Sequence, residues 1–257
     1  MKSSFARFLL AGSILYSLIS AAQQPQPAGA SSPQQSQPAT PTPPAQNKDD
    51  KDKKDKDQAS GTSNDRLFYA LPNFLTLENG AQVPPLTARG KFKVVARSSF
   101  DYVQVPWYGF LAGVSQAENS EPGYGQGAEG YGKRFGAAYA DGTIENFMTG
   151  AILPSLLHQD PRFFQSSEGG FARRTGYAVS RIFITRTDSG HSQFNFSEIF
   201  GSALSAGIST YSYHPREDKT LANTASVWGS EVGYDTITIV VKEFWPDIRR
   251  KLSKNKK

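Results

Sequence analysis

The chain of 257 residues contains no cysteine, two methionines and three histidines. Because it has no cysteine, it cannot form disulfides, and its stability must come from an ordinary core. The same absence excludes a diacylglycerol-anchored lipoprotein, which needs a cysteine at its cleavage site. The apolar run at the N-terminus, from Phe8 to Ile19, is about a dozen residues long, whereas a membrane-spanning helix needs roughly 20.

The first 22 residues have the features of a secretory signal peptide. Lys2 and Arg7 precede the apolar run, and Ser20-Ala21-Ala22 supplies the small residues that a signal peptidase recognises. The shortness of the run argues against the alternative, a membrane anchor. We therefore expect residues 1–22 to be removed, the mature chain to have no transmembrane helix, and the protein to be exported to the periplasm or the outer membrane.

Residues 23–64 are predicted to be a disordered linker. Residues 23–46 are rich in Pro, Gln and Ser, and residues 47–64 alternate Lys with Asp. Neither part has enough apolar residues to offset the entropy lost when a backbone becomes ordered. We expect an extended tether without a binding role of its own, which holds the following domain away from a surface.

The net charge of +5 is unevenly distributed. Residues 65–248 hold 15 Lys or Arg and 18 Asp or Glu, a net charge of −3, whereas residues 249–257 hold six basic residues and no acid. A basic tail of this kind either contacts anionic lipid or complements a helix C-terminus. The acidic body and the predicted export argue against nucleic acid as a partner.

Apolar residues at steps of three and four predict that residues 65–248 form one helical domain. Ser197 is the expected N-cap of one helix, and Thr220 or Asn223 that of the last, which ends or restarts near Trp245-Pro246. We expect an all-α fold, a compact bundle of about seven helices, among them residues 91–102, 106–119, 131–151, 171–187, 200–211 and 234–248.

Small residues recur in two of these helices and predict close helix contacts. They are Gly130, Gly132, Gly136, Ala137 and Ala138 in one, and Gly201, Ala203, Ala206 and Gly207 in the other. Such spacing allows close approach in membranes and in soluble bundles alike, and the nearby charges favour the soluble case. An all-β architecture is the competing interpretation, since residues 92–95 and 236–241 alternate as strands do, but it requires many more such segments.

The stretch TRTDSGHSQFN, residues 185–195, carries a candidate catalytic motif. Ser189-Gly190-His191 resembles the second motif of the type-2 phosphatidic acid phosphatase and vanadium haloperoxidase superfamily. The step from His214 to Asp218 is similar to that of its third motif, and the step from Arg174 to Arg181 to that of its first. Asp188 stands where the family has proline.

This resemblance implies an all-helical fold and a histidine-nucleophile phosphatase that acts on envelope lipids. It implies that His214 attacks phosphorus while Asp218 orients its imidazole, and that His191 protonates the leaving group. The implied phosphate ligands are Arg174, Arg181, Ser189 and Gly190, the last two through their backbone amides.

A metal site is a third interpretation. His158 and Asp160, together with His191 and either Glu198 or Asp188, offer nitrogen and oxygen ligands, but their spacing matches no established ligand pair. The alternative is that Asp160-Pro161 starts a turn and Arg162 pairs with a nearby carboxylate. We predict no metal and no cofactor.

Longer segments resemble a family of uncharacterised secreted bacterial proteins. The segments at residues 147–164, 175–209 and 242–252 carry this resemblance, which extends over most of residues 66–252 and implies a shared fold and export without a known activity. We therefore predict a structural or binding module of the cell envelope rather than an enzyme, with envelope lipid or a cell-wall polymer as its partner. The phosphatase is the alternative.

Overall fold

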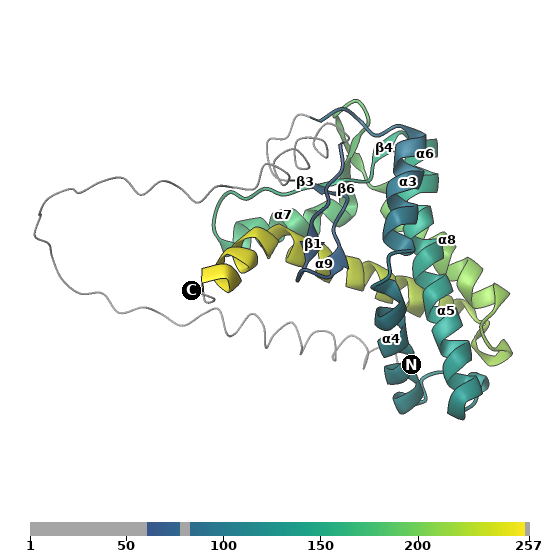
Figure 1. Ribbon diagram of the computed structural model, residues 1–257. Coiled ribbons are helices and arrows are strands. Elements are labelled where there is room, and N and C mark those ends of the chain that lie inside the picture. Colours follow the sequence, from purple (N-terminus) through teal and green to yellow (C-terminus); the bar gives the residue numbers. More distant parts are fainter. Residues whose placement is uncertain (1–60, 78–82, 255–257) are drawn as a thin grey trace, which may run out of the picture.

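The structure is a computed structural model that describes residues 61–77 and 83–254. The predicted signal peptide, all but the last four residues of the predicted linker and the end of the basic tail lie outside the described residues. The described part is mostly helical, with a few short strands (Figure 1). Its α-helices are α3 (Ala88–Ser99), α4 (Gln104–Glu118), α5 (Gly127–Phe147), α6 (Leu153–Leu156), α7 (Phe171–Phe183), α8 (Phe196–Ser212) and α9 (Leu221–Lys254).

Helix α5 continues without a break into α6, so the described residues form six helical rods rather than about seven. The link is η2 (Met148–Ile152), a π-helical segment. A π turn is wider than an α turn, and this one comes directly before Pro154, whose ring would clash with a preceding carbonyl group in a regular α-helix. Two 3-10 turns, η1 (Pro122–Tyr124) and η3 (Arg216–Asp218), complete the helical elements of the described residues.

The prediction of a helix up to Thr187 is wrong for its last four residues. They form strand β6 (Ile184–Thr187), which pairs with β7 (Ser192–Phe194) on one side and β4 (Gln159–Asp160) on the other, both antiparallel. Residues 188–190 form the turn between β6 and β7, and Gly190 adopts a φ of 88°, which favours glycine. The other strands are β1 (Arg66–Leu67), β2 (Leu71–Pro72), β3 (Thr76–Leu77) and β5 (Phe163–Phe164).

The helix caps agree only partly with the prediction. Thr220 caps α9, because its Oγ1 accepts from the Asn223 amide at 3.1 Å. Helix α8 is capped by Asn195, which accepts from the Glu198 amide, while Ser197 lies inside the helix and donates to Gln159 Oε1 at 2.7 Å. Helix α9 also neither ends nor restarts at Pro246 but continues through it to Lys254. Six residues of the predicted basic tail are therefore helical.

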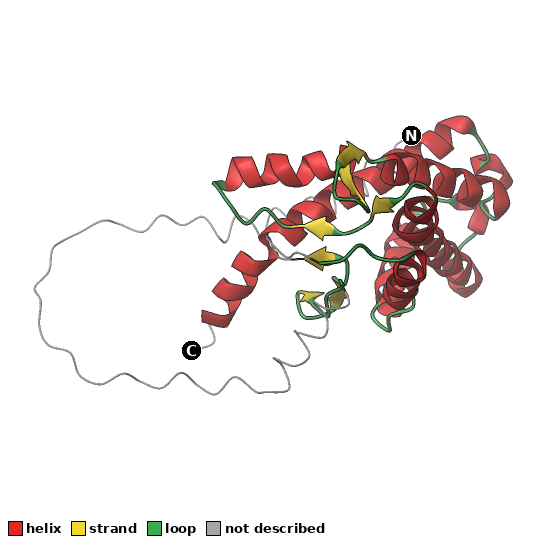
Figure 2. Cartoon of the chain, turned by 90° about the horizontal axis from the view of Figure 1, so that it is seen from above, coloured by secondary structure: helices red, strands yellow, loops and turns green. Residues whose placement is uncertain are grey.

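Helix α5 occupies the centre of the bundle and packs against α4 and α8, while α9 packs against α8 and then α7 (Figure 1). Viewed from above, most helices gather at one end of the molecule, and α7 and α9 lie toward the other end, where α9 reaches the C-terminus (Figure 2). The predicted close contact is present at Gly201, where an added Cβ would lie 3.3 Å from the Thr149 backbone. The prediction is wrong for Gly132, Gly136 and Gly207, because nothing lies within 4 Å of a Cβ added there. One cluster of the apolar core consists of Phe74, Leu86, Val94, Val95 and Ala151.

Candidate functional site

The structure does not bring the predicted catalytic histidines together. His191 precedes helix α8 and His214 follows it. A helix of 17 residues is about 25 Å long, whereas two groups that contact one phosphate lie within roughly 8 Å. His191 and His214 therefore cannot contact the same phosphate group, as the phosphatase mechanism requires.

The predicted phosphate-binding turn is an exposed hairpin with local hydrogen bonds. Ser189 Oγ lies 3.0 Å from His191 Nδ1 and 2.9 Å from Thr187 Oγ1. Asp188 accepts from the buried Lys91 ammonium at 2.8 Å, and Lys91 also donates to two backbone carbonyls. This ion pair explains the aspartate that departs from the phosphatase motif, since it anchors the hairpin to α3.

The two predicted arginines have different environments. Arg174 is buried and pairs with Glu243 at 2.8 Å and Asp247 at 2.5 Å, so its charge is used within the protein. Arg181, in the last turn of α7, lies 4.9 Å from the centre of the Tyr177 ring. Arg174 therefore links α7 to α9, whereas Arg181 contacts residues of its own helix.

His214 is buried at the end of α8 and faces carboxylates. Its Nε2 lies 3.4 Å from Asp141 and its Nδ1 lies 3.8 Å from Glu121. Burial alone would lower the pKa of His214, but the carboxylates of Asp141, Glu121 and Asp218 outweigh it, and the pKa is raised. Burial and Glu217 raise the pKa of Asp218. Asp141, rather than the predicted Asp218, is thus the closest carboxylate to the ring.

The metal interpretation also lacks its geometry. Within residues 61–77 and 83–254, no group of three or more His, Cys, Asp or Glu is arranged to hold a metal ion. Asp160 pairs with Arg162 at 2.6 Å, as the alternative interpretation predicts. Asp188 pairs with Lys91, and His158 adopts a left-handed backbone conformation at the end of α6.

The outer surface of α8 is apolar, and its inner surface is made of small and polar residues. Steps of four and three place Phe196, Phe200, Leu204, Ile208 and Tyr211 within an arc of about 120°. All five are exposed, with fractions between 38% and 53%. The buried residues of α8 are instead Ser197, Gly201, Ser202, Ser205, Ala206, Ser209 and Thr210. The orientation of this helix is the reverse of that in an ordinary water-soluble bundle.

The apolar surface continues beyond α8 onto the hairpin. Phe194 of β7 lies 5.0 Å from Phe196, between ring centres, and pairs in register with the exposed Ile184. Phe183, which ends α7, is exposed as well. We call these eight residues the α8 face: Phe183, Ile184, Phe194, Phe196, Phe200, Leu204, Ile208 and Tyr211. They expose roughly 700 Å² of side chain, somewhat more than the largest apolar patch of a typical monomer.

Charged groups are almost absent from this face. The only charged residue of α8 is Glu198, which points inward. Two basic residues lie at the ends of the face: Arg186 is exposed on the same side of β6 as Ile184, and Lys219 donates to the Tyr211 carbonyl at 2.8 Å. In the described part of the chain, no helix is both long and apolar enough to span a membrane.

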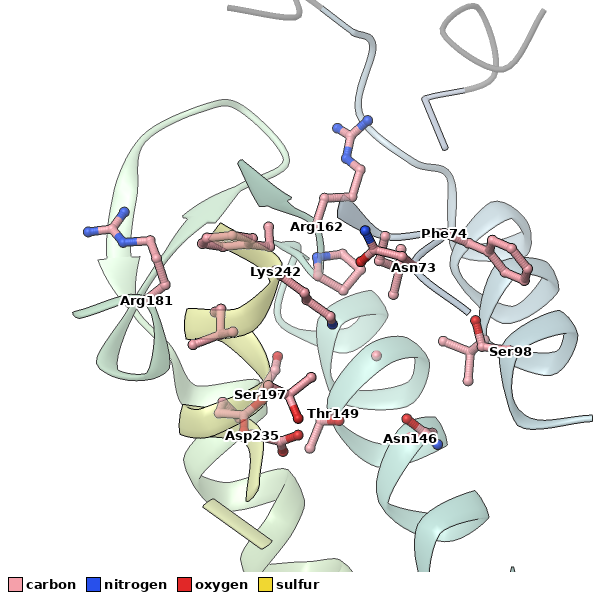
Figure 3. Close-up of a pocket in the computed structure, with 18 of the residues that line it drawn as sticks. Asn73, Phe74, Ser98, Asn146, Thr149, Arg162, Arg181, Ser197, Asp235 and Lys242 are labelled. Atoms are coloured by element: carbon pink, nitrogen blue, oxygen red, sulfur yellow. The ribbon is translucent and has the colours of Figure 1, made fainter. Parts of the chain in front are cut away.

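The polar side chains that α8 and its neighbours turn inward line a cavity of about 390 Å³ (Figure 3). Glu145 of α5, Glu198 of α8 and Asp235 of α9 contribute carboxyl groups, and Lys242 of α9 contributes an ammonium group. The Asp235 carboxyl lies within hydrogen-bonding reach of both glutamates. Figure 3 shows Lys242 extending into the cavity above Asp235.

The cavity shifts the titration of all four groups. Burial, followed by the charge of Asp235, raises the pKa of Glu145 and of Glu198 well above the usual range of a glutamate. Burial also raises the pKa of Asp235, although hydrogen bonds with both glutamates act in the opposite direction. Burial lowers the pKa of Lys242, partly offset by Asp235 and Glu198. Burial in the cavity therefore favours the neutral forms of its ionisable groups.

No family model matches this chain, and neither the curated proteins nor the solved structures contain a match. The geometry alone therefore identifies two candidate sites, the α8 face and the cavity behind it. Sequence analysis found the stripe on α8 but assigned it no site, and it named Glu198 only as a metal ligand. Two signals pointed to the cavity: Glu198 is the single charge of α8, and Asp235 and Lys242 are seven residues apart, on one side of α9.

Proposed function

We propose that this protein is an exported, non-enzymatic module of the cell envelope that binds a phospholipid surface through the α8 face. The inverted orientation of α8 carries the proposal. A helix with its small and polar residues inside and its aromatic and aliphatic residues outside suits apolar surroundings. The predicted signal peptide and tether support the location.

The energetics favour binding on the surface rather than across it. Burying half of the roughly 700 Å² of the α8 face contributes on the order of 9 kcal/mol, before the cost of immobilising the protein. Helix α8 is the central element of this face and lies flat in the interfacial layer of a bilayer. Arg186 and Lys219, at its two ends, are then placed to meet anionic headgroups, each contributing about 1 kcal/mol.

Flotation of the mature protein with phospholipid vesicles tests this proposal. We expect the protein to float with vesicles that contain anionic lipid, and the double variant Phe200→Glu with Leu204→Glu to remain in the unbound fraction. The matched control is Leu221→Glu with Leu252→Glu, since these leucines are also exposed but lie in the first and last turns of α9.

Equal flotation of the two double variants would contradict the proposal. So would a stable dimer that is lost only in the α8 variant and does not float, because the face would then belong to a second copy of the chain.

A further inference from the structure

We propose that the cavity behind α8 is a binding site for a small zwitterion with an ammonium group at one end and a carboxylate at the other. The ammonium group would lie among Glu145, Glu198 and Asp235, and the carboxylate would lie against Lys242. This site is separate from the α8 face, and its occupant is a dissolved molecule rather than a lipid.

The acidic end has the acceptors that an ammonium group requires. Three carboxyl groups from three helices converge there, and Asp235 reaches both of the others. One oxygen of Glu145 and one of Glu198 are buried without a hydrogen-bond partner in the described structure. An ammonium group carries three donors and no acceptor, so it can satisfy oxygens from all three carboxyl groups.

The basic end supplies the second, independent observation. Lys242 is partly buried at the wall of the cavity, and its ammonium group makes no hydrogen bond or ion pair with any residue of the described ranges. Side chains of a helix lean toward its N-terminus, so Lys242 reaches back along α9 toward Asp235 (Figure 3). A ligand carboxylate would give this partly buried cation a partner.

The chemistry of the walls selects a zwitterion over other ligands. A simple cation would satisfy the acidic end but would leave Lys242 unpaired beside it. A metal ion is disfavoured, because no described cluster of His, Cys, Asp and Glu has suitable geometry. A zwitterion brings no net charge into the cavity, and a volume of about 390 Å³ is within the range of small-molecule sites.

Isothermal titration of the mature protein with straight-chain ω-amino acids tests the proposal. Glycine, β-alanine, γ-aminobutyrate and their longer homologues vary the distance between the two charges. We expect one length to bind about tenfold or more tightly than the corresponding amine or carboxylate alone. Failure of all lengths to bind protein that is folded by circular dichroism would overturn the proposal.

Substitutions in the cavity then test which residues bind the ammonium group of the ligand and which bind its carboxylate. Lys242→Met should reduce the affinity for the best zwitterion to that of the amine alone, and leave amine binding unchanged. Glu198→Gln and Asp235→Asn should weaken both ligands by about tenfold or more, since they remove an anionic partner while keeping size. The control pair Glu129→Gln and Lys133→Met removes an exposed ion pair on α5 and should have no effect.

Equal losses in the control and the cavity variants would contradict the assignment. So would metal binding that excludes the amino acid from the same carboxyl groups. Vesicle flotation of Glu198→Gln separates the two proposals, because this residue points away from the α8 face and the variant should still float.

Discussion

At the scale of single residues, the buried ionisable groups make stability depend on pH. The pKa of His214 is raised above its usual value of 6.5, because the carboxylates of Asp141, Glu121 and Asp218 outweigh the effect of burial. A raised pKa means that protonated His214 stabilises the folded state below about pH 6.5, and that this contribution is lost as the pH rises through the folded pKa.

We therefore expect His214→Gln to lower the melting temperature more at pH 6 than at pH 9. Thermal unfolding of both proteins at the two pH values measures the difference, and His191→Gln, in the exposed hairpin, is the control. A loss that is the same at both pH values would show that His214 contributes packing alone.

Glu231 gives the same sign of pH dependence, but its substitution should stabilise the protein rather than destabilise it. Burial, followed by the charges of Asp141 and Asp235, raises its pKa from 4.5 to about 9. Between these values the folded protein retains a proton that the unfolded chain releases, so stability falls as the pH rises from 4.5 to about 9. Glu231→Gln should be more stable than the original protein by a few kcal/mol at pH 8 and no more stable at pH 4.5. Urea unfolding at both pH values checks this, and a gain of equal size at pH 4.5 would refute it.

At the scale of secondary-structure elements, periodicity predicted most helices but not the side that each one buries. The spacing of Phe200, Leu204 and Ile208 shows that they share one face, and that face is equally consistent with a core or a surface. Tertiary contacts decide it: Gly201 packs on η2, and Trp228 donates to the Ile199 carbonyl from α9. The hairpin at residues 184–194 was missed because its strands are only four and three residues long, and because the further pairing of β6 with β4 joins residues that are distant in sequence.

Two glycines of α8 provide a matched pair for testing its orientation. A Cβ at Gly201 would lie 3.1 Å from Thr149 Cγ2 and 3.3 Å from backbone atoms of η2, whereas nothing lies within 4 Å of a Cβ at Gly207. Gly201→Ala should therefore destabilise the protein by about 1–3 kcal/mol, because α8 and η2 must move apart to make room for the added methyl group. Gly207→Ala should stabilise it by up to about 1 kcal/mol through helix propensity. Denaturant unfolding compares them, and equal effects would argue against the inward placement of Gly201.

At the scale of the whole molecule, helix α8 turns small and polar side chains toward the interior and apolar side chains outward. Some of the cavity residues could be recognised in the sequence. Glu198 is the one charged residue of α8, and Asp235 and Lys242 form an acid–base pair seven residues apart in α9. The sequence did not reveal that Glu145, Glu198 and Asp235 meet, because they belong to three helices whose packing depends on small residues far apart in sequence. The same packing turns the α8 face outward, so the cavity and the exposed surface have one structural origin.

Vesicles with and without anionic lipid separate the electrostatic contribution to lipid binding from the contribution of the apolar area. Arg186→Gln with Lys219→Gln removes the basic groups at both ends of the α8 face and leaves its apolar area intact. At about 1 kcal/mol per charge, binding to vesicles with anionic lipid should weaken by roughly 30-fold, while the weaker binding to neutral vesicles stays the same. Cosedimentation over a range of lipid concentrations measures both, and Arg89→Gln with Lys93→Gln, exposed on α3, is the matched control. If the control weakens anionic binding as much, the attraction is a property of overall charge and the orientation of α8 toward the lipid is wrong.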